Sequence, residues 1–348
     1  MKLLKLSSPY SFCDSLKWVY YYFFPSIHNH SGIHLSPMKS GDTGPDKLNI
    51  SFVGDLMCLK NEKMVMPNAQ MLKIFEQSDL VVINLEAPIV RDYVEKGNNL
   101  VVFSFSSEFI KNFLEVFKLP AEKVIFSIAN NHMGDDGKKG YVETIKRLEE
   151  LKIKWVGGLS TIKAVLTIYK KNTHVGFMAY SQWLNHKVFD ETLGICRYHH
   201  VENIDFQKIK IEYELDALIL LPHWGLEFRH FPSAGLVQTA KDFMAKGVDL
   251  IAGHHPHVLG PIEKINHGLC HYSLGNFFSK TLHDVTHLTG VWTVSIDATK
   301  NAEKKFAYKL HPFFMTSQYQ FETIDRLPEK LKSKLQKRLS LIYPESDG

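Results

Sequence analysis

The sequence is poor in cysteine, has no long hydrophobic run and carries almost no excess charge, and each absence excludes a class of protein. The four cysteines form no CxxC pair, so neither a disulfide scaffold nor a cysteine-based zinc site is expected. A net charge of +4 over 348 residues makes no case for a nucleic-acid partner. The hydrophobic share of 45% and the charged share of 22% are ordinary for a globular protein, which excludes a disordered or collagen-like chain.

The N-terminal region lacks the marks of a signal peptide and of a transmembrane helix. Ser7 and Pro9 break its apolar run, and no small-x-small cleavage site follows. The aromatic run Trp18–Phe24 is far shorter than the ~20 residues that a membrane-spanning helix needs. We therefore expect a cytoplasmic or peripheral membrane protein. For residues 16–27 two alternatives stay open: packing on the domain, or peripheral contact with a membrane interface.

Composition divides the chain into three parts. Residues 26–47 are rich in Ser, Gly, Pro, His and Asn, which is typical of a linker. We predict a leader and linker over residues 1–47, disordered or membrane-interfacial, followed by one domain over residues 48–320. Residues 321–348 are predicted to form a basic amphipathic helix, over 327–341, and a tail, most simply as a solvated cap on the domain.

Apolar runs alternate with segments of helical spacing, which indicates an α/β or mixed α+β fold. The runs that predict strands are 48–53, 79–84, 123–129, 174–180, 216–221, 248–252, 289–296 and 306–314. The segments that predict helices, besides the C-terminal one, are 141–151 and 234–246. In such folds ligands bind where strands end in loops, so the residues after each strand are the first candidates for a site.

Polar side chains follow five of these strands. In chain order they are Asp55; Asn84 and Glu86; Asn131, His132 and Asp135; His223 and Glu227; and His254, His255 and His257. Taken singly, each could be a turn or cap residue or a hydrogen-bonded core histidine. Five such groups in succession instead predict one shared site built from many strands.

The chemistry of these side chains predicts a metal site. Carboxylates, an amide oxygen and several imidazoles suit borderline divalent ions such as Mn, Zn, Fe or Co. The candidates outnumber the ligands of one tetrahedral ion. Two divalent metal ions would use them better, because a pair about 3.5–4 Å apart clamps the attacking and leaving oxygens of a phosphoester.

The order of the motifs resembles the CapA family, which is linked to poly-γ-glutamate capsule synthesis. The motifs are Gly54-Asp55, Asn84–Pro88, Asn130–Gly137, His223–Glu227, Gly253–Val258 and Ser273–Phe277. The resemblance covers roughly residues 48–278. That family in turn looks like a divergent branch of the calcineurin-like metallophosphoesterases. The resemblance implies a four-layer α/β/β/α sandwich with a dinuclear metal centre.

The resemblance also implies a ligand set. By position in the motifs, the metal ligands would be Asp55, Glu86, Asn131, His223, His255 and His257. Asn84 and His254 are further candidates for the metal or the substrate, since an inserted residue could make the histidine pair His254 and His257. Met57 stands where the superfamily has a ligand histidine, and a thioether is a poor ligand for such ions.

The third motif implies the catalytic groups. His132 would assist the leaving group, and Asp135 would orient His132. Glu227 could contact substrate, and Asn276 could support the site from a neighbouring strand.

Two metal-dependent functions remain open from the sequence, beside a metal-free binding domain with the same fold. The first is a phosphoester hydrolase, acting on an anionic substrate. The alternative is a non-catalytic, metal-dependent factor that binds or exports an anionic polymer such as polyglutamate. Fold alone does not separate them, and the replacement by Met57 keeps the second in view.

Overall fold

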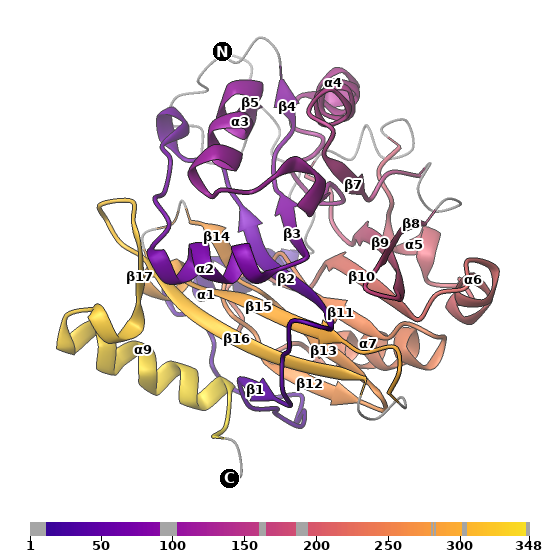
Figure 1. Ribbon diagram of the computed structural model, residues 1–348. Coiled ribbons are helices and arrows are strands. Elements are labelled where there is room, and N and C mark those ends of the chain that lie inside the picture. The colour runs from indigo at the N-terminus through magenta and orange to yellow at the C-terminus, as the bar shows by residue number, and fades with distance from the viewer. Residues whose placement is uncertain are drawn as a thin grey trace.

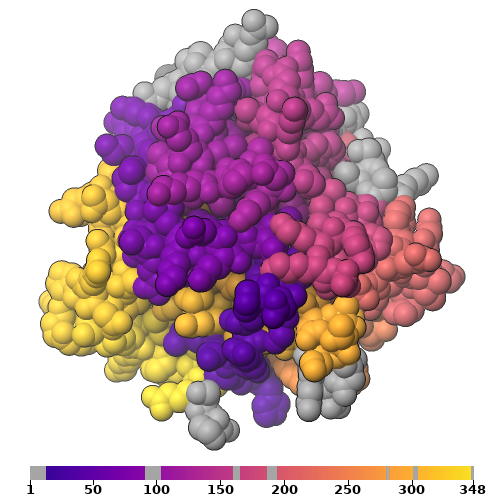
Figure 2. All heavy atoms as spheres, viewed as in Figure 1, coloured from indigo at the N-terminus to yellow at the C-terminus, as the bar shows by residue number. Residues whose placement is uncertain are grey.

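Two β-sheets stack face to face, and helices cover both outer faces (Figure 1). The computed structural model describes residues 12–90, 103–159, 165–185, 194–279, 281, 283–300 and 305–345. Figure 2 shows the same side with all atoms drawn, and there the yellow C-terminal segment forms one flank of the molecule.

The first sheet combines a parallel half with an antiparallel half. Its strand order is β1 (Lys39–Ser40), β16 (Phe306–Met315), β15 (Leu288–Ile296), β2 (Leu48–Leu56), β3 (Leu80–Leu85), β6 (Val124–Ser127) and β7 (Lys154–Val156), with β14 (Asn276–Phe278) on β2 and β17 (Phe321–Thr323) on β16. Four of these strands, β2, β3, β6 and β7, run parallel, so their carboxyl ends meet at one edge.

The second sheet has four parallel strands between two antiparallel edge strands. Its order is β12 (Ile262–Ile265), β13 (Gly268–His271), β11 (Leu250–Ala252), β10 (Ala217–His223), β9 (Thr173–Ser181) and β8 (Leu166–Lys170). A separate pair joins β4 (Ile89–Val90) to β5 (Phe105–Ser106).

The described residues form nine α-helices, several of which connect parallel strands. They are α1 (Phe12–Phe23), α2 (Ala69–Gln77), α3 (Ser107–Val116), α4 (Gly137–Glu150), α5 (Tyr198–Val201), α6 (Phe206–Glu212), α7 (Ala234–Ala245), α8 (Asp284–His287) and α9 (Glu329–Ile342). Short 3-10 turns are η1 (Lys60–Glu62), η2 (Ala121–Lys123) and η6 (Ile324–Arg326). Asn68, Ser106 and Ser233 cap α2, α3 and α7, because each side chain accepts a hydrogen bond from a backbone N–H of the first turn.

Alternation along β10 explains the four layers. Ile219 and Leu221 belong to the core that lies between the sheets, whereas Leu218 and Leu220 face the core shared with α7. On the far side, α2 and α3 pack on the first sheet, with Phe75 among the buried side chains. The predicted α/β sandwich with layers α, β, β and α is therefore confirmed.

The predicted strands are present, but one helix has a different role from the one expected. The C-terminal helix α9 was predicted over residues 327–341 as a solvated cap. Leu335, Leu339 and Ile342 are buried in the central core, so α9 closes the core as well as facing solvent. Its spacing of four and three residues places these side chains on one stripe.

Residues 12–47 lie along the domain. Ser26 pairs with the backbone around Arg229, and β1 adds to the edge of the first sheet beside β16. Within the described ranges, no helix combines the length and apolarity needed to cross a membrane.

His230 joins α9 to the rest of the fold. Its Nδ1 donates to the Leu259 carbonyl oxygen at 2.6 Å, and its Nε2 accepts from Arg338 of α9 at 2.9 Å. Burial and the charge of Arg338 lower the pKa of His230 to about 3. The imidazole is therefore neutral in the folded protein at pH 7.

We predict that His230 makes the fold sensitive to acid. Its pKa is lower in the folded state than in the unfolded state, so its contribution is complete above pH ~6.5 and declines as the pH falls. Between pH 7 and pH 5 it should lower the free energy of unfolding by roughly 2 kcal/mol. His230→Gln keeps a donor and an acceptor but cannot titrate, and should lose less stability over this range. Urea unfolding at both pH values measures the difference. Equal losses in His230→Gln, in the wild type and in the exposed control His199→Gln would contradict the prediction.

Candidate metal centre

The predicted site residues gather where the carboxyl ends of strands from both sheets meet. Asp55 lies in the last residues of β2, Asn84 near the end of β3, and His223 ends β10. Glu86 directly follows β3, and the loops after β6 and β11 supply Asn131 to Asp135 and His254 to His257. The parallel strands bring these ends to one edge, so residues far apart in sequence become neighbours.

Asp55 is held rigidly at the centre of the cluster. Its Oδ1 accepts a hydrogen bond from Asn84 Nδ2 at 2.8 Å. Its Oδ2 accepts one from the backbone N–H of His255 at 3.2 Å and lies 3.1 Å from His257 Nδ1. The side chain is fully buried, so these contacts fix the direction of the carboxylate.

The position before Asp55 has room only for a glycine. A Cβ atom on Gly54 would lie 2.0 Å from the carbonyl oxygen of Gly275, which is an impossible contact. This closeness lets Asp55 N–H donate to that carbonyl at 2.9 Å and lets β14 pair with the end of β2. The Gly-Asp motif therefore reflects close backbone approach as well as chemistry.

The histidine loop is bent sharply. His255 and His257 have φ values of 96° and 58°, in the region that L-residues rarely adopt. This conformation turns both side chains toward Glu86: ligand atoms of Glu86, His255 and His257 all lie within 4.8 Å of one another. Backbone strain of this kind is typical of functional sites.

His223 connects the histidine loop with the loop after β6. Its Nε2 lies 2.8 Å from Asn131 Oδ1, 3.1 Å from His255 Nδ1 and 3.6 Å from Glu86 Oε1. All four are atoms that can bind a borderline divalent ion. Two nitrogens bound at about 2.0–2.1 Å to one tetrahedral zinc are also separated by roughly 3.3 Å, so the spacing fits.

Glu86 supplies the strongest sign that a cation belongs here. Both of its carboxylate oxygens are fully buried, and neither has a hydrogen-bond partner among the described residues. Burial and the charge of Asp55 raise the pKa of Glu86 well above its usual range. A buried carboxylate without donors is costly, and a metal ion removes that cost. The residues present therefore fit the predicted ion.

The imidazoles around Glu86 differ in their charge when no metal ion is bound. Burial opposes charge on His257, but the carboxylates of Glu86 and Asp55 raise its pKa to about 10. Burial lowers the pKa of His255 to about 4, and burial with nearby imidazoles holds that of His223 well below its usual value. Neutral imidazoles keep the lone pairs that metal ions need, and His257 must release its extra proton when it binds an ion.

A second group adjoins the ligands. His132 Nδ1 lies 2.9 Å from Asp135 Oδ2, and the Phe103 ring packs on the imidazole at 4.2 Å between ring centres. Asp135 also accepts a hydrogen bond from the Phe103 backbone N–H. The predicted partnership of His132 with Asp135 thus has the required geometry, and its catalytic role stays a prediction.

Sequence reasoning missed Asn185. This residue follows β9, and its amide nitrogen lies 3.3 Å and 3.4 Å from the two ring nitrogens of His132. Its Oδ1 accepts from Asn131 Nδ2 at 3.2 Å, so it joins the two halves of the third motif. No motif surrounds it in the sequence, so only the fold could identify it.

The remaining candidates lie around the cluster with different orientations. His254 Nε2 is 3.3 Å from the Val53 carbonyl oxygen, outside the group formed by Glu86, His255 and His257. Asn276 Oδ1 lies 2.9 Å from His257 Nδ1 and orients that ring. Met57 is buried.

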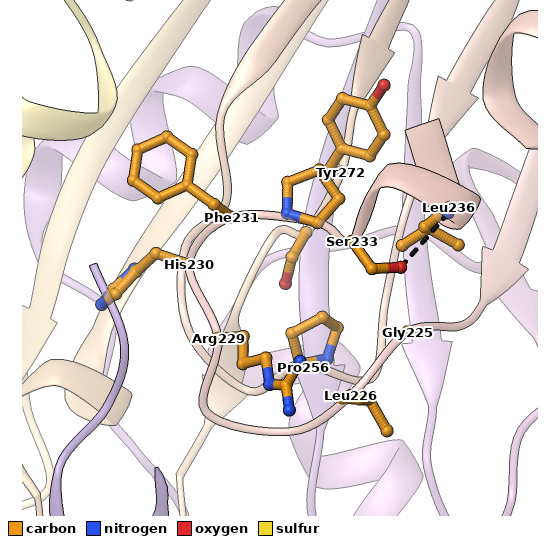
Figure 3. Close-up of a pocket in the computed structure, with 11 residues that line it drawn as sticks. Gly225, Leu226, Arg229, His230, Phe231, Ser233, Leu236, Pro256 and Tyr272 are labelled. Atoms are coloured by element: carbon orange, nitrogen blue, oxygen red, sulfur yellow. Dashed lines mark hydrogen bonds between the residues drawn. The ribbon is translucent and has the colours of Figure 1, made fainter. Parts of the chain in front are cut away.

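Glu227 lies at the border of the ligand cluster, close enough for its charge to act on His255, His257 and Glu86. It accepts a hydrogen bond from Trp18 Nε1 of α1 at 2.8 Å. The loop that carries it, Gly225–Ser233, encloses a separate small pocket lined by Arg229, His230 and Tyr272 (Figure 3). In Figure 3 the dashed line marks the cap that Ser233 places on α7.

Comparison with known families identifies the chain. A family model described as "Bacterial capsule synthesis protein PGA_cap" matches residues 49–281, which contain every residue of the cluster. The chain belongs to this family. It is 28% identical over 261 residues to "Capsule biosynthesis protein CapA" of Bacillus anthracis, covering 70% of this chain and 62% of that protein. It is 27% identical over 248 residues to "PGA biosynthesis protein CapA" of Bacillus subtilis (strain 168), covering 67% and 63%. The chain thus spans less than two thirds of the length of the curated relatives it matches.

A solved structure, a phosphatase from Mycoplasma pneumoniae, has a TM-score of 0.44 and 13% sequence identity with the chain. The comparison covers 78% of this chain and 96% of that one. Because this TM-score lies below 0.5, the fold assignment rests on the two sheets and the two hydrophobic cores described above.

We predict that purified protein binds divalent metal through this cluster. Glu86→Gln and His257→Ala should each lose most of the bound metal, because each substitution removes a proposed ligand atom that the neighbouring side chains cannot replace. Elemental analysis after incubation with Mn²⁺ or Zn²⁺ measures the content. His199→Ala removes an exposed histidine and serves as the control, which should bind metal as the wild type does. Equal metal content in all four proteins would refute the assignment.

Proposed function

We infer that the chain is a metal-dependent hydrolase of phosphoester bonds that acts in the synthesis of a capsule polymer. The observation that supports this proposal is Glu86, a buried carboxylate without hydrogen-bond partners beside neutral imidazoles. A cation beside such a group removes the cost of its burial. Membership in the capsule synthesis family supplies the biological setting.

The ligand set proposed from the motifs is compatible with the observed distances. Two ions are proposed, because the superfamily that the motifs resemble has a dinuclear centre. They would be held by Asp55, Glu86, Asn131, His223, His255 and His257. Divalent ions here would polarise a phosphoryl oxygen and lower the pKa of water.

We propose that His132 transfers a proton. With Nδ1 donating to Asp135, the other ring nitrogen can carry the proton that a leaving oxygen needs. Asp135 fixes the tautomer, and Asn185 and Phe103 restrict the ring to one orientation. The Phe103 ring also keeps water from one face of the imidazole, which strengthens the contact with Asp135.

Met57 is the feature that leaves room for the alternative function. It stands where the superfamily pattern has a ligand histidine, and its buried thioether would contribute little to a borderline ion. A centre with one weaker position can still bind carboxylates or phosphates of a polymer without cleaving them. Metal binding without hydrolysis would therefore favour the polymer-binding role.

We predict that His132→Ala separates catalysis from metal binding. Loss of a general acid should lower the turnover of the metal-loaded enzyme about 10²–10⁴-fold. Metal content should stay close to that of the wild type, because His132 is not among the proposed ligands. The assay uses p-nitrophenyl phosphate and bis(p-nitrophenyl) phosphate, with elemental analysis on the same samples.

Two outcomes count against this scheme. Loss of metal in His132→Ala would make His132 a ligand and overturn its proposed role. The second outcome is a metal-loaded wild type that hydrolyses neither compound and no member of a wider panel of phosphoesters. That result would favour the polymer-binding function over hydrolysis.

A further inference from the structure

Helix α1 exposes an unusual amount of apolar surface. Among the described residues, ten large hydrophobic side chains are exposed, and five of them belong to this helix and the residue after it: Leu16, Val19, Tyr20, Phe23 and Phe24. Their exposed fractions run from 51% to 65%. Positions 16, 19, 20 and 23 repeat every three or four residues, so they form one continuous stripe. The other five are scattered over other elements, which is ordinary for a soluble surface.

The stripe faces outward because the opposite side of α1 is fixed to the domain. Trp18 and Tyr22 pack on the Phe228 ring at 5.8 Å and 5.3 Å between ring centres. Trp18 donates to Glu227, and Tyr21 lies under the Arg229 guanidinium at 4.5 Å. These contacts hold the helix in one rotation, so the stripe cannot turn inward to bury itself.

A basic helix borders the aromatic end of the stripe. Phe23 and Phe24 line one depression together with Lys334 and Arg338 of α9 and with Asp284, whose carboxylate pairs with Lys334 at 2.8 Å. The sequence of α9 holds five basic residues, Lys330, Lys332, Lys334, Lys337 and Arg338, against one acidic residue, Glu329. Lys17 adds an ammonium on α1 itself, which pairs with Asp14 at 3.8 Å while 57% of its side chain stays accessible.

We propose that the α1 stripe and the basic side of α9 form a docking surface for an anionic phospholipid bilayer. Aromatic side chains prefer the boundary between lipid headgroups and acyl chains, and lysines beside them are attracted to negatively charged headgroups. A protein partner or a second copy would need complementary acidic groups around an apolar groove. A bilayer supplies both properties on one plane, which fits an exposed apolar stripe with a basic neighbour.

The proposed docking does not depend on catalysis by the metal centre. It would, however, fix how that centre is oriented relative to the bilayer. The residues that anchor α1, Glu227 and Phe228, belong to the loop after His223, and the Phe228 ring lies 6.3 Å from the His257 ring. A chain docked through α1 therefore keeps its metal ligands close to the lipid surface.

Co-sedimentation of the full chain with vesicles tests the surface. The probes are vesicles of mixed phosphatidylglycerol and phosphatidylcholine, and vesicles of phosphatidylcholine alone, at low and high salt. The wild type should bind the anionic vesicles at low salt and be released by high salt. Phe23→Ser with Phe24→Ser should reduce binding about tenfold or more. Lys334→Gln with Lys337→Gln should reduce it about fivefold per lysine removed.

The matched control removes two exposed apolar side chains elsewhere. Tyr169→Ser with Ile211→Ser changes β8 and α6, and should bind vesicles as the wild type does. The proposal is wrong if the wild type does not bind anionic vesicles or if the control loses as much binding as the Phe23 and Phe24 variant. It is also wrong if the wild type is a dimer in solution that the Phe23 and Phe24 variant converts to a monomer, since the stripe would then pair two copies.

Discussion

A carboxylate removed from water needs a positive partner, and the edge where the two sheets meet is built around that need. Glu86 is fully buried without a donor, and the only charged imidazole close to it is that of His257 among the described residues. Desolvation of a lone charge costs several kcal/mol, and nothing in an apolar core offsets it. The loops from both sheets therefore converge on a carboxyl group whose raised pKa favours its neutral form unless a cation is bound.

Amides rather than further charges organise the cluster. Each asparagine near the centre contacts a proposed ligand or another asparagine; they are Asn84, Asn130, Asn131, Asn185 and Asn276. An amide carries a donor and an acceptor and no net charge, so it can fix a carboxylate on one side and an imidazole on the other. Adding carboxylates for the same purpose would have increased the repulsion that already raises the pKa of Glu86.

Much of this arrangement could be predicted from the sequence, because it follows from strand ends. Continuous apolar runs identified the buried parallel strands, and the polar residues after them had to meet at one edge. What remained hidden depends on side-chain direction. Nothing in the sequence indicates that Glu227 turns toward Trp18, or that Asn185 bridges to His132 across a loop. The core role of α9 was hidden because its charged residues outnumber the three that it buries.

The contact between Gly54 and Gly275 has a consequence for how the centre is assembled. It joins a strand near the start of the domain to one near its end, so the first and last groups of the site are fixed by the same short backbone contact. Pairings between such distant segments form late in folding, since the long intervening loop must close first. Asp55 therefore gains its backbone contact with Gly275 only after β14 has been synthesised and paired with β2, so the site is completed together with the domain.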